Sequence, residues 1–64
     1  MTKLQDLRKK KGLSQSQLAE RSGVNVRMVK YYEQGVKDIN KAQLLTAVAL
    51  AKALGCKAED LVEE

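Results

Sequence analysis

The chain contains no histidine, tryptophan, phenylalanine or proline, and its 64 residues include a single cysteine. One cysteine excludes a disulfide within the chain, and the lack of histidine excludes a zinc site of the Cys/His type. The same absences leave acid–base and nucleophilic catalysis poorly supplied, so we expect no enzymatic activity and no cofactor. Two tyrosines are the only aromatic residues, so the core must be built from aliphatic side chains.

Long hydrophobic runs are also missing from the sequence. No stretch approaches the roughly 20 apolar residues that span a bilayer, and no signal peptide is visible. A lone cysteine suits a reducing compartment, so we expect a cytoplasmic protein. The length has room for one small domain, which we assign to residues 1–64. Met1 and the acidic end favour a complete small protein, or at least an intact N-terminus, over one piece of a longer chain.

Charge is distributed unevenly along the chain. Residues 1–37 hold nine Lys and Arg against three Asp and Glu, whereas residues 38–64 hold three against five. A basic first half on an acidic second half indicates a polyanion-binding face on a supporting scaffold. A basic surface that contacts only solvent has the same composition, so charge alone leaves both interpretations open.

Four glycines divide the chain, and each follows a stretch of helical periodicity, as left-handed helix caps do. The sequence therefore predicts an all-α fold. The five predicted helices cover residues 2–11, 14–22, 25–34, 41–54 and 58–63. The fourth is apolar around much of its circumference, which is typical of a helix that is buried or shared with a partner.

Polar residues at the predicted helix starts support these boundaries. Ser14 and Gln17 have the spacing of a capping box, in which each side chain satisfies a main-chain N–H of the other. Asn25 is a favourable N-cap for the third helix. Asn40, with Gln43 three residues later, is the expected cap of the fourth helix.

A helical wheel of the third helix separates two faces. Met28, Val29 and Tyr32 form an apolar side with Glu33 at its edge, and we expect Tyr32 to lie in the core. The opposite side carries Arg27, Lys30, Tyr31 and Gln34. Arg and Lys side chains suit the base edges of a DNA major groove, although an ordinary solvated face has similar chemistry.

The spacing of small and apolar residues favours the DNA-binding interpretation. Ala19 is small enough for the next helix to cross closely, and Gly23 permits a left-handed turn. Val24 and Val29 are expected to anchor the turn and the helix that follows. Two short helices joined by a glycine-containing turn form the helix-turn-helix motif.

The sequence resembles the Cro/phage-repressor family of helix-turn-helix proteins, also called the xenobiotic-response-element family. The resemblance covers nearly the whole chain. It is carried by Gly12-Leu13-Ser14-Gln15, Leu18-Ala19-Glu20, Gly23-Val24, Tyr32-Glu33-Gln34-Gly35, Ala51-Lys52-Ala53-Leu54-Gly55 and Asp60-Leu61. It implies a five-helix lambda-repressor-like domain, a bacterial or phage origin, and binding to double-stranded DNA as a dimer. The segment between Gly35 and Ala51 is a few residues longer than in the shortest members and lacks their proline.

The resemblance also implies roles for individual residues. The helix at 26–34 is the recognition helix, and Arg8 and Glu33 match a structural pair that ties the first helix to the third. The residues assigned to DNA contact are Gln15, Gln17, Asn25, Val26, Arg27, Lys30, Tyr31 and Lys37. The residues assigned to the structural motif are Arg8, Ala19, Gly23, Val29 and Glu33. Val26 either meets a thymine methyl group or packs, and Tyr31 either bonds a phosphate or is simply exposed.

We therefore expect a sequence-specific transcriptional regulator that represses by occupying a near-palindromic operator. A homodimer through the fourth and fifth helices, including Leu61 and Val62, is predicted. The alternative is a protein-interaction module such as the antitoxin of a toxin–antitoxin pair. For Lys9, Lys10 and Lys11 a solvated surface is favoured over DNA-backbone contact, and for Cys56 packing is favoured over a redox switch.

Overall fold

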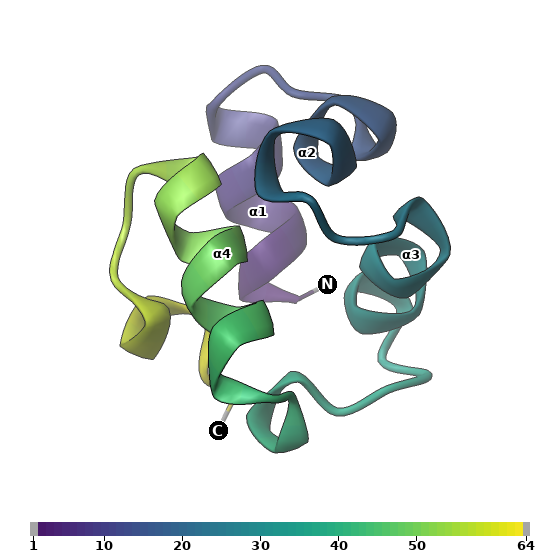
Figure 1. Ribbon diagram of the computed structural model, residues 1–64, viewed down its shortest axis with the longest axis vertical. Coiled ribbons are helices and arrows are strands. Elements are labelled where there is room, and N and C mark those ends of the chain that lie inside the picture. Colours follow the sequence, from purple (N-terminus) through teal and green to yellow (C-terminus); the bar gives the residue numbers. More distant parts are fainter. Residues whose placement is uncertain (1, 64) are drawn as a thin grey trace.

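The computed structural model describes residues 2–63, and these form an all-helical domain without strands (Figure 1). The α-helices are α1 (Lys3–Lys10), α2 (Gln15–Ser22), α3 (Val26–Gln34) and α4 (Leu44–Leu54). Two short 3₁₀ turns complete the chain, η1 (Ile39–Lys41) and η2 (Ala58–Leu61). The predicted first three helices are confirmed. The prediction of five helices is not matched, because the described chain has four α-helices.

The predicted caps of α2 and α3 are present. The Ser14 hydroxyl accepts from the Gln17 main-chain N–H at 3.0 Å, and the Gln17 side-chain oxygen accepts from the Ser14 N–H at 2.8 Å. Asn25 Oδ1 accepts from the Arg27 N–H at 2.8 Å. The four glycines all have positive φ, between 70° and 77°, as left-handed caps require. Local hydrogen bonding therefore sets where the helices begin and end.

The predicted start of the fourth helix was wrong. Asn40 lies inside η1, and α4 begins at Leu44 after Gln43, which makes no side-chain cap hydrogen bond. Asp38 begins η1 instead, because its Oδ1 accepts from the Asn40 N–H at 2.9 Å. The Asn40 side chain is thereby left free to bond elsewhere in the molecule.

The last predicted helix, 58–63, is instead the 3₁₀ turn η2, which stops at Leu61. Val62 is extended, with φ −67° and ψ 128°, because the chain leaves the turn toward Asn40 and Lys3. Leu61 is 1% exposed and packs in the core, so it is not available to a dimer interface. The part of the prediction that placed Leu61 in that interface was wrong.

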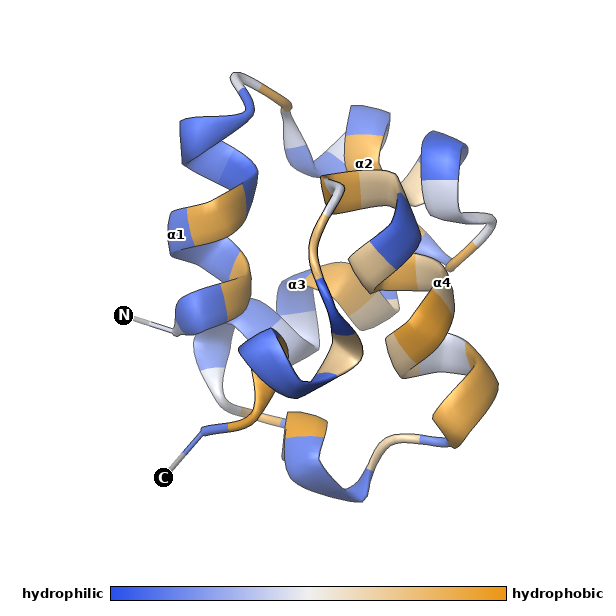
Figure 2. Ribbon diagram, turned by 90° about the vertical axis from the view of Figure 1, so that its left-hand side faces the viewer, coloured by the Kyte–Doolittle hydropathy of each residue, from blue (hydrophilic) through white to orange (hydrophobic). Residues whose placement is uncertain are grey.

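The core is aliphatic apart from Tyr32, as composition predicts. Its members come from every helix and both 3₁₀ turns. They are Leu4, Leu13, Leu18, Ala19, Val29, Tyr32, Ile39, Leu50, Ala51, Leu54 and Leu61. Figure 2 shows that α4 is apolar along most of its length, whereas α1 is mostly hydrophilic. No helix within residues 2–63 is long and apolar enough to cross a membrane.

Candidate DNA-binding surface

The turn between α2 and α3 is tightly bonded. The Gly23 N–H donates to the Ala19 carbonyl at 2.9 Å, and the Val24 N–H donates to the Ser22 hydroxyl at 3.2 Å. Gly23 has φ 74°, a conformation that costs a side-chain-bearing residue about 1 kcal/mol or more. Ala19 is buried beneath the turn, where a small residue allows α3 to approach. The predicted helix-turn-helix geometry is confirmed.

The inner face of α3 is fixed in the core. Val29 and Tyr32 are buried there, and so is Glu33, the one buried charged residue among those described. At the end of α3, the Gly35 N–H bonds the Tyr32 carbonyl and the Val36 N–H bonds the Tyr31 carbonyl. This is the Schellman arrangement, which satisfies otherwise unpaired carbonyls. Both the side and the end of α3 are therefore held in place.

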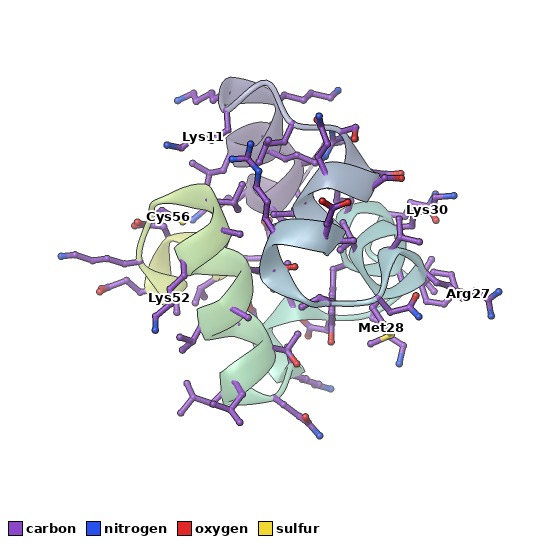
Figure 3. The ribbon with its side chains drawn as sticks, turned by 45° about the horizontal axis from the view of Figure 1, so that its top comes forward. Lys11, Arg27, Met28, Lys30, Lys52 and Cys56 are labelled. Atoms are coloured by element: carbon purple, nitrogen blue, oxygen red, sulfur yellow. The ribbon has the colours of Figure 1, made fainter. Side chains whose placement is uncertain are left out.

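The outer face of α3 carries two exposed cations. Arg27 and Lys30 point away from the body of the molecule (Figure 3), and neither forms an ion pair with another described residue. Val26 is 37% exposed at the first helical position, and Tyr31 is half-buried beside Lys30. An accessible positive helix face of this kind suits a polyanion.

Arg8 of α1 and Glu33 of α3 form the predicted pair. Arg8 Nε lies 2.6 Å from Glu33 Oε2, and Arg8 Nη2 lies 3.1 Å from Glu33 Oε1. Arg8 Nη1 donates to the Leu13 carbonyl at 2.8 Å. Gln15 Nε2 donates to Glu33 Oε1 at 3.0 Å. The carboxylate thus receives donors from both α1 and α2, which fixes the orientation of α3 against the two preceding helices.

A family model described as Helix-turn-helix matches residues 4–61. The chain belongs to the Cro/C1-type, XRE-like helix-turn-helix family. Membership indicates a DNA-binding regulator of the Cro/C1 type. Searches of curated proteins and of solved structures found no significant match.

In this helix-turn-helix protein, several predicted contact residues already bond within the chain. The side-chain oxygens of Gln17 and Asn25 accept main-chain hydrogens at the helix caps, and Gln15 bonds Glu33. All three lie at helix starts, and Gln17 and Asn25 are exposed. Lys37 is separate from them, exposed in the connection after α3, where its N–H donates to the Tyr31 carbonyl at 3.2 Å.

Lys11 lies on another side of the helix-turn-helix domain from Arg27 and Lys30 (Figure 3). Its ammonium nitrogen comes within 3.1 Å of the position that a Cβ on Gly55 would occupy. Lys11 therefore covers the C-terminal end of α4, where a cation is favoured by the helix dipole. Lys9, Lys10 and Lys11 are all exposed.

Cys56 is a free, half-buried thiol close to Lys11 and Asp60. Burial raises the pKa of the Cys56 thiol, Asp60 raises it further, and the nearby Lys11 ammonium lowers it. The net direction is upward. A raised pKa disfavours the thiolate, which is the reactive form of cysteine.

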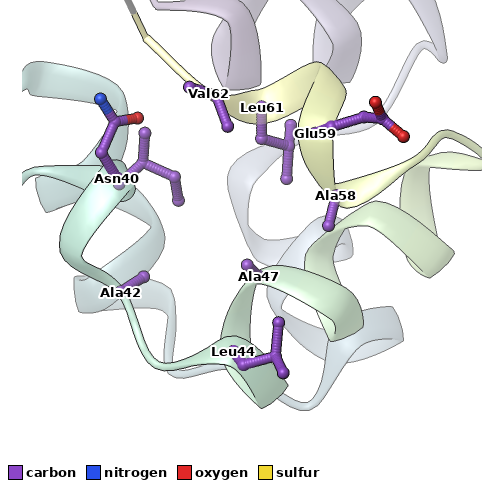
Figure 4. A pocket seen from close by; sticks show the side chains of 9 residues that line it. Asn40, Ala42, Leu44, Ala47, Ala58, Glu59, Leu61 and Val62 are labelled. Atoms are coloured by element: carbon purple, nitrogen blue, oxygen red, sulfur yellow. The ribbon is translucent and has the colours of Figure 1, made fainter.

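An apolar surface lies between η1, the start of α4 and η2. Leu44 and Leu45 are 74% and 81% exposed, and Val62 is 43% exposed. Beside them is a groove of about 240 Å³ (Figure 4). Its lining includes Ile39, Asn40, Ala42, Leu44, Ala47, Ala58, Glu59, Leu61 and Val62.

Sequence reasoning missed several interactions of this family member, among them one of Arg8 and one of Asn40. The Leu13 carbonyl is bonded by Arg8, and the Asn40 amide bonds the main chain of Glu63. The bonds between Asn40 and Glu63 have no local sequence signal, because these residues are 23 positions apart. Arg8 and Leu13 are only five positions apart, and the turn at Gly12 brings them together. The exposed pair Leu44 and Leu45 did have a signal, since two leucines opening a mostly apolar helix cannot both face one core.

Proposed function

We propose that the protein is a transcriptional repressor that reads the DNA major groove with α3. The observation that carries this proposal is the division of α3 into a buried face, fixed by Glu33, and an exposed face that carries Arg27 and Lys30. A recognition helix must be held rigidly while its outer side chains reach base edges. Repression then follows from occupancy, because a protein bound at an operator excludes RNA polymerase.

Contacts of two kinds are proposed. Arg27, near the start of α3, presents a planar fork suited to guanine O6 and N7, and Lys30 contacts guanine or phosphate. Val26 is exposed enough to meet a thymine methyl group. Gln15 is assigned to a phosphate or a base edge. Gln17, Asn25, Tyr31 and Lys37 are assigned to the sugar–phosphate backbone. Backbone contacts fix the register of the protein on DNA, and base contacts provide the sequence preference.

We further propose that the protein binds DNA as a homodimer through the surface around Leu44, Leu45 and Val62. One recognition helix contacts too few base pairs for useful specificity in a genome. Two-fold pairing doubles the site and requires a near-palindrome with half-sites about 34 Å apart. The exposed leucines support this surface, because exposed apolar side chains beside a groove are typical of an interaction site.

The decisive experiment is selection of bound duplexes from a random DNA pool at several salt concentrations. The expected result is an enriched near-palindrome for which the logarithm of the binding constant falls linearly with the logarithm of salt concentration. The double variant Arg27→Ala/Lys30→Ala is compared with the wild type in the same selection. Both side chains are exposed, so their removal leaves the core intact. Equal enrichment by the wild type and this double variant would contradict the proposal that α3 reads DNA.

The same apolar surface supports a second candidate function, binding to a different protein chain, as an antitoxin binds its toxin. Leu44 and Leu45 are large apolar side chains that are mostly exposed in the single chain. A different protein chain could cover them as well as a second copy of this chain would. Sedimentation of the purified protein separates the two candidates. A dimer at micromolar concentration favours the repressor. A monomer that stays monomeric on its selected DNA favours the partner-binding function.

A further inference from the structure

Residues 35–43 connect α3 to α4. Apart from bonds to these two adjacent helices, the connection is hydrogen-bonded to the rest of the described chain through Asn40 alone. Asn40 Nδ2 donates to the Glu63 carbonyl, and the Glu63 N–H donates to Asn40 Oδ1 at 2.8 Å. We call this pair of bonds the C-terminal clip. Every other hydrogen bond of residues 35–43 within the described chain is local or joins the adjacent end of α3.

The clip is itself anchored to α1. The Glu63 carboxylate accepts from the main-chain N–H of Lys3, in the first turn of that helix. A helix N-terminus favours a carboxylate, since its first N–H groups are unpaired and its dipole is positive. Asn40 is therefore linked through Glu63 to α1, the helix that also carries Arg8.

The chemistry of the clip requires a primary amide. A primary amide both donates and accepts, so it pairs with the N–H and the carbonyl of a single residue as a second peptide group would. A hydroxyl is too short to reach both groups, and a carboxylate has no hydrogen to donate. Asn40 is thus fitted to this task, although it does not cap α4.

We propose that Asn40 is a positioning residue for DNA binding, which acts by holding the connection so that Lys37 faces the phosphate backbone. This inference rests on the proposed function. Lys37 is exposed three residues before Asn40, and Ile39, between them, is buried. With the clip broken, the connection is oriented only by the Val36 and Lys37 N–H bonds to the Tyr31 carbonyl, the local bonds of η1 and the burial of Ile39. The side chain of Lys37 then samples more positions, and its phosphate contact is weakened.

The test is a double-mutant cycle on the selected operator duplex, measured by fluorescence anisotropy across a salt series. Lys37→Ala should lower affinity and reduce the log–log salt slope by about one for each protomer bound. Asn40→Ala should reproduce most of both effects although it removes no charge. Asn40→Ala/Lys37→Ala should then bind no more weakly than Lys37→Ala alone. Gln43→Ala is the control, because Gln43 is an exposed amide of the same connection and its side chain does not cap α4.

A second pair of variants breaks the clip from its other side. Glu63→Pro removes the N–H that donates to Asn40, and Glu63→Ala removes the carboxylate but keeps that N–H. Val62 has φ −67° and ψ 128°, which a residue before proline tolerates. Glu63→Pro breaks the clip and Glu63→Ala keeps it. Affinity should therefore depend less steeply on salt concentration for Glu63→Pro than for Glu63→Ala. Circular dichroism checks that each variant is folded at the temperature of the binding measurement.

Three results would overturn the inference. The first is that Asn40→Ala binds DNA as tightly as the wild type. The second is that the affinity lost by the double variant equals the product of the losses of the two single variants, which would mean that Asn40 and Lys37 act independently. The third is an inert Lys37→Ala while Arg27→Ala and Lys30→Ala still weaken binding, which would place the connection away from DNA and leave the proposed function intact. Failure of the proposed function looks different, because Arg27→Ala and Lys30→Ala would then also be inert.

Discussion

Arg8 and Glu33 are joined by two hydrogen bonds, from Nε to Oε2 at 2.6 Å and from Nη2 to Oε1 at 3.1 Å. The pair is shielded from water, with the Arg8 side chain 11% exposed and the Glu33 side chain 1% exposed. Neutralising one partner of such a pair leaves the other as an uncompensated charge. The pair is therefore more costly to break than an ion pair on the surface.

Glu33→Ala should lower the free energy of unfolding by up to about 3–5 kcal/mol. The loss includes the donors of Arg8 and Gln15 that the carboxylate satisfies. Chemical denaturation monitored by circular dichroism measures it. Glu20→Ala is the control, because Glu20 is exposed on α2 and its removal should change stability by no more than about 0.5 kcal/mol. Equal midpoints for the two variants would contradict a stabilising role for the pair.

Arg27→Ala should remove about 1–3 kcal/mol of discrimination between bases at one position of each half-site. Lys37→Ala should leave the preferred sequence unchanged and weaken binding to all sequences alike. Selection from a random DNA pool with each variant measures both effects. If both variants select the same sequences and differ only in salt dependence, Arg27 contacts the backbone and the assigned reading face is wrong.

Leu45→Asp should abolish dimerisation and leave the fold intact, because Leu45 is 81% exposed and a charge there costs the monomer little. Sedimentation velocity with and without operator DNA measures the assembly. Leu50→Ala serves as the contrast, since Leu50 is fully buried on the same helix and its truncation should cost about 2–5 kcal/mol. A Leu45→Asp protein that sediments as a dimer would exclude the proposed interface.

Cys56 should react slowly with iodoacetamide near pH 8, because its raised pKa leaves little thiolate. Asp60→Asn should lower that pKa and speed alkylation at a given pH, whereas Lys11→Gln should raise the pKa and slow it. The pH dependence of the alkylation rate, followed by mass spectrometry, gives the pKa of each variant. Opposite shifts from the two variants are expected, and equal shifts would contradict the assigned neighbours.

The sequence predicts well those features that depend on neighbouring residues, such as helix caps and helix faces. The capping box of Ser14 and Gln17 spans four residues and needs no distant partner, so its pattern is sufficient. The two faces of α3 follow in the same way from helical periodicity. The inward direction of Arg8 and Glu33 is likewise set by each helix. The family resemblance supplied their pairing, since the two residues are 25 positions apart.

The errors arise where distant segments compete with local preference. Asparagine is a residue type favoured at helix N-caps, yet Asp38 starts the turn. Asn40 bonds Glu63 instead, which lies 23 residues away. The same bonds draw the chain out of helical geometry after Leu61, so the last helix is shorter than its residues suggest. No local pattern distinguishes Leu61 in the core from Val62 at the surface, because both are apolar and adjacent.

The bond between the Lys3 main chain and the Glu63 carboxylate brings the two ends of the described chain together. Only a short linker is needed to join such ends. A circularly permuted protein is therefore accessible, with new termini opened at Gly12, where the turn is exposed and a Cβ would meet no atom within 4 Å. In that permutant α1 becomes the final helix of the chain, so it is synthesised after all the elements against which it packs.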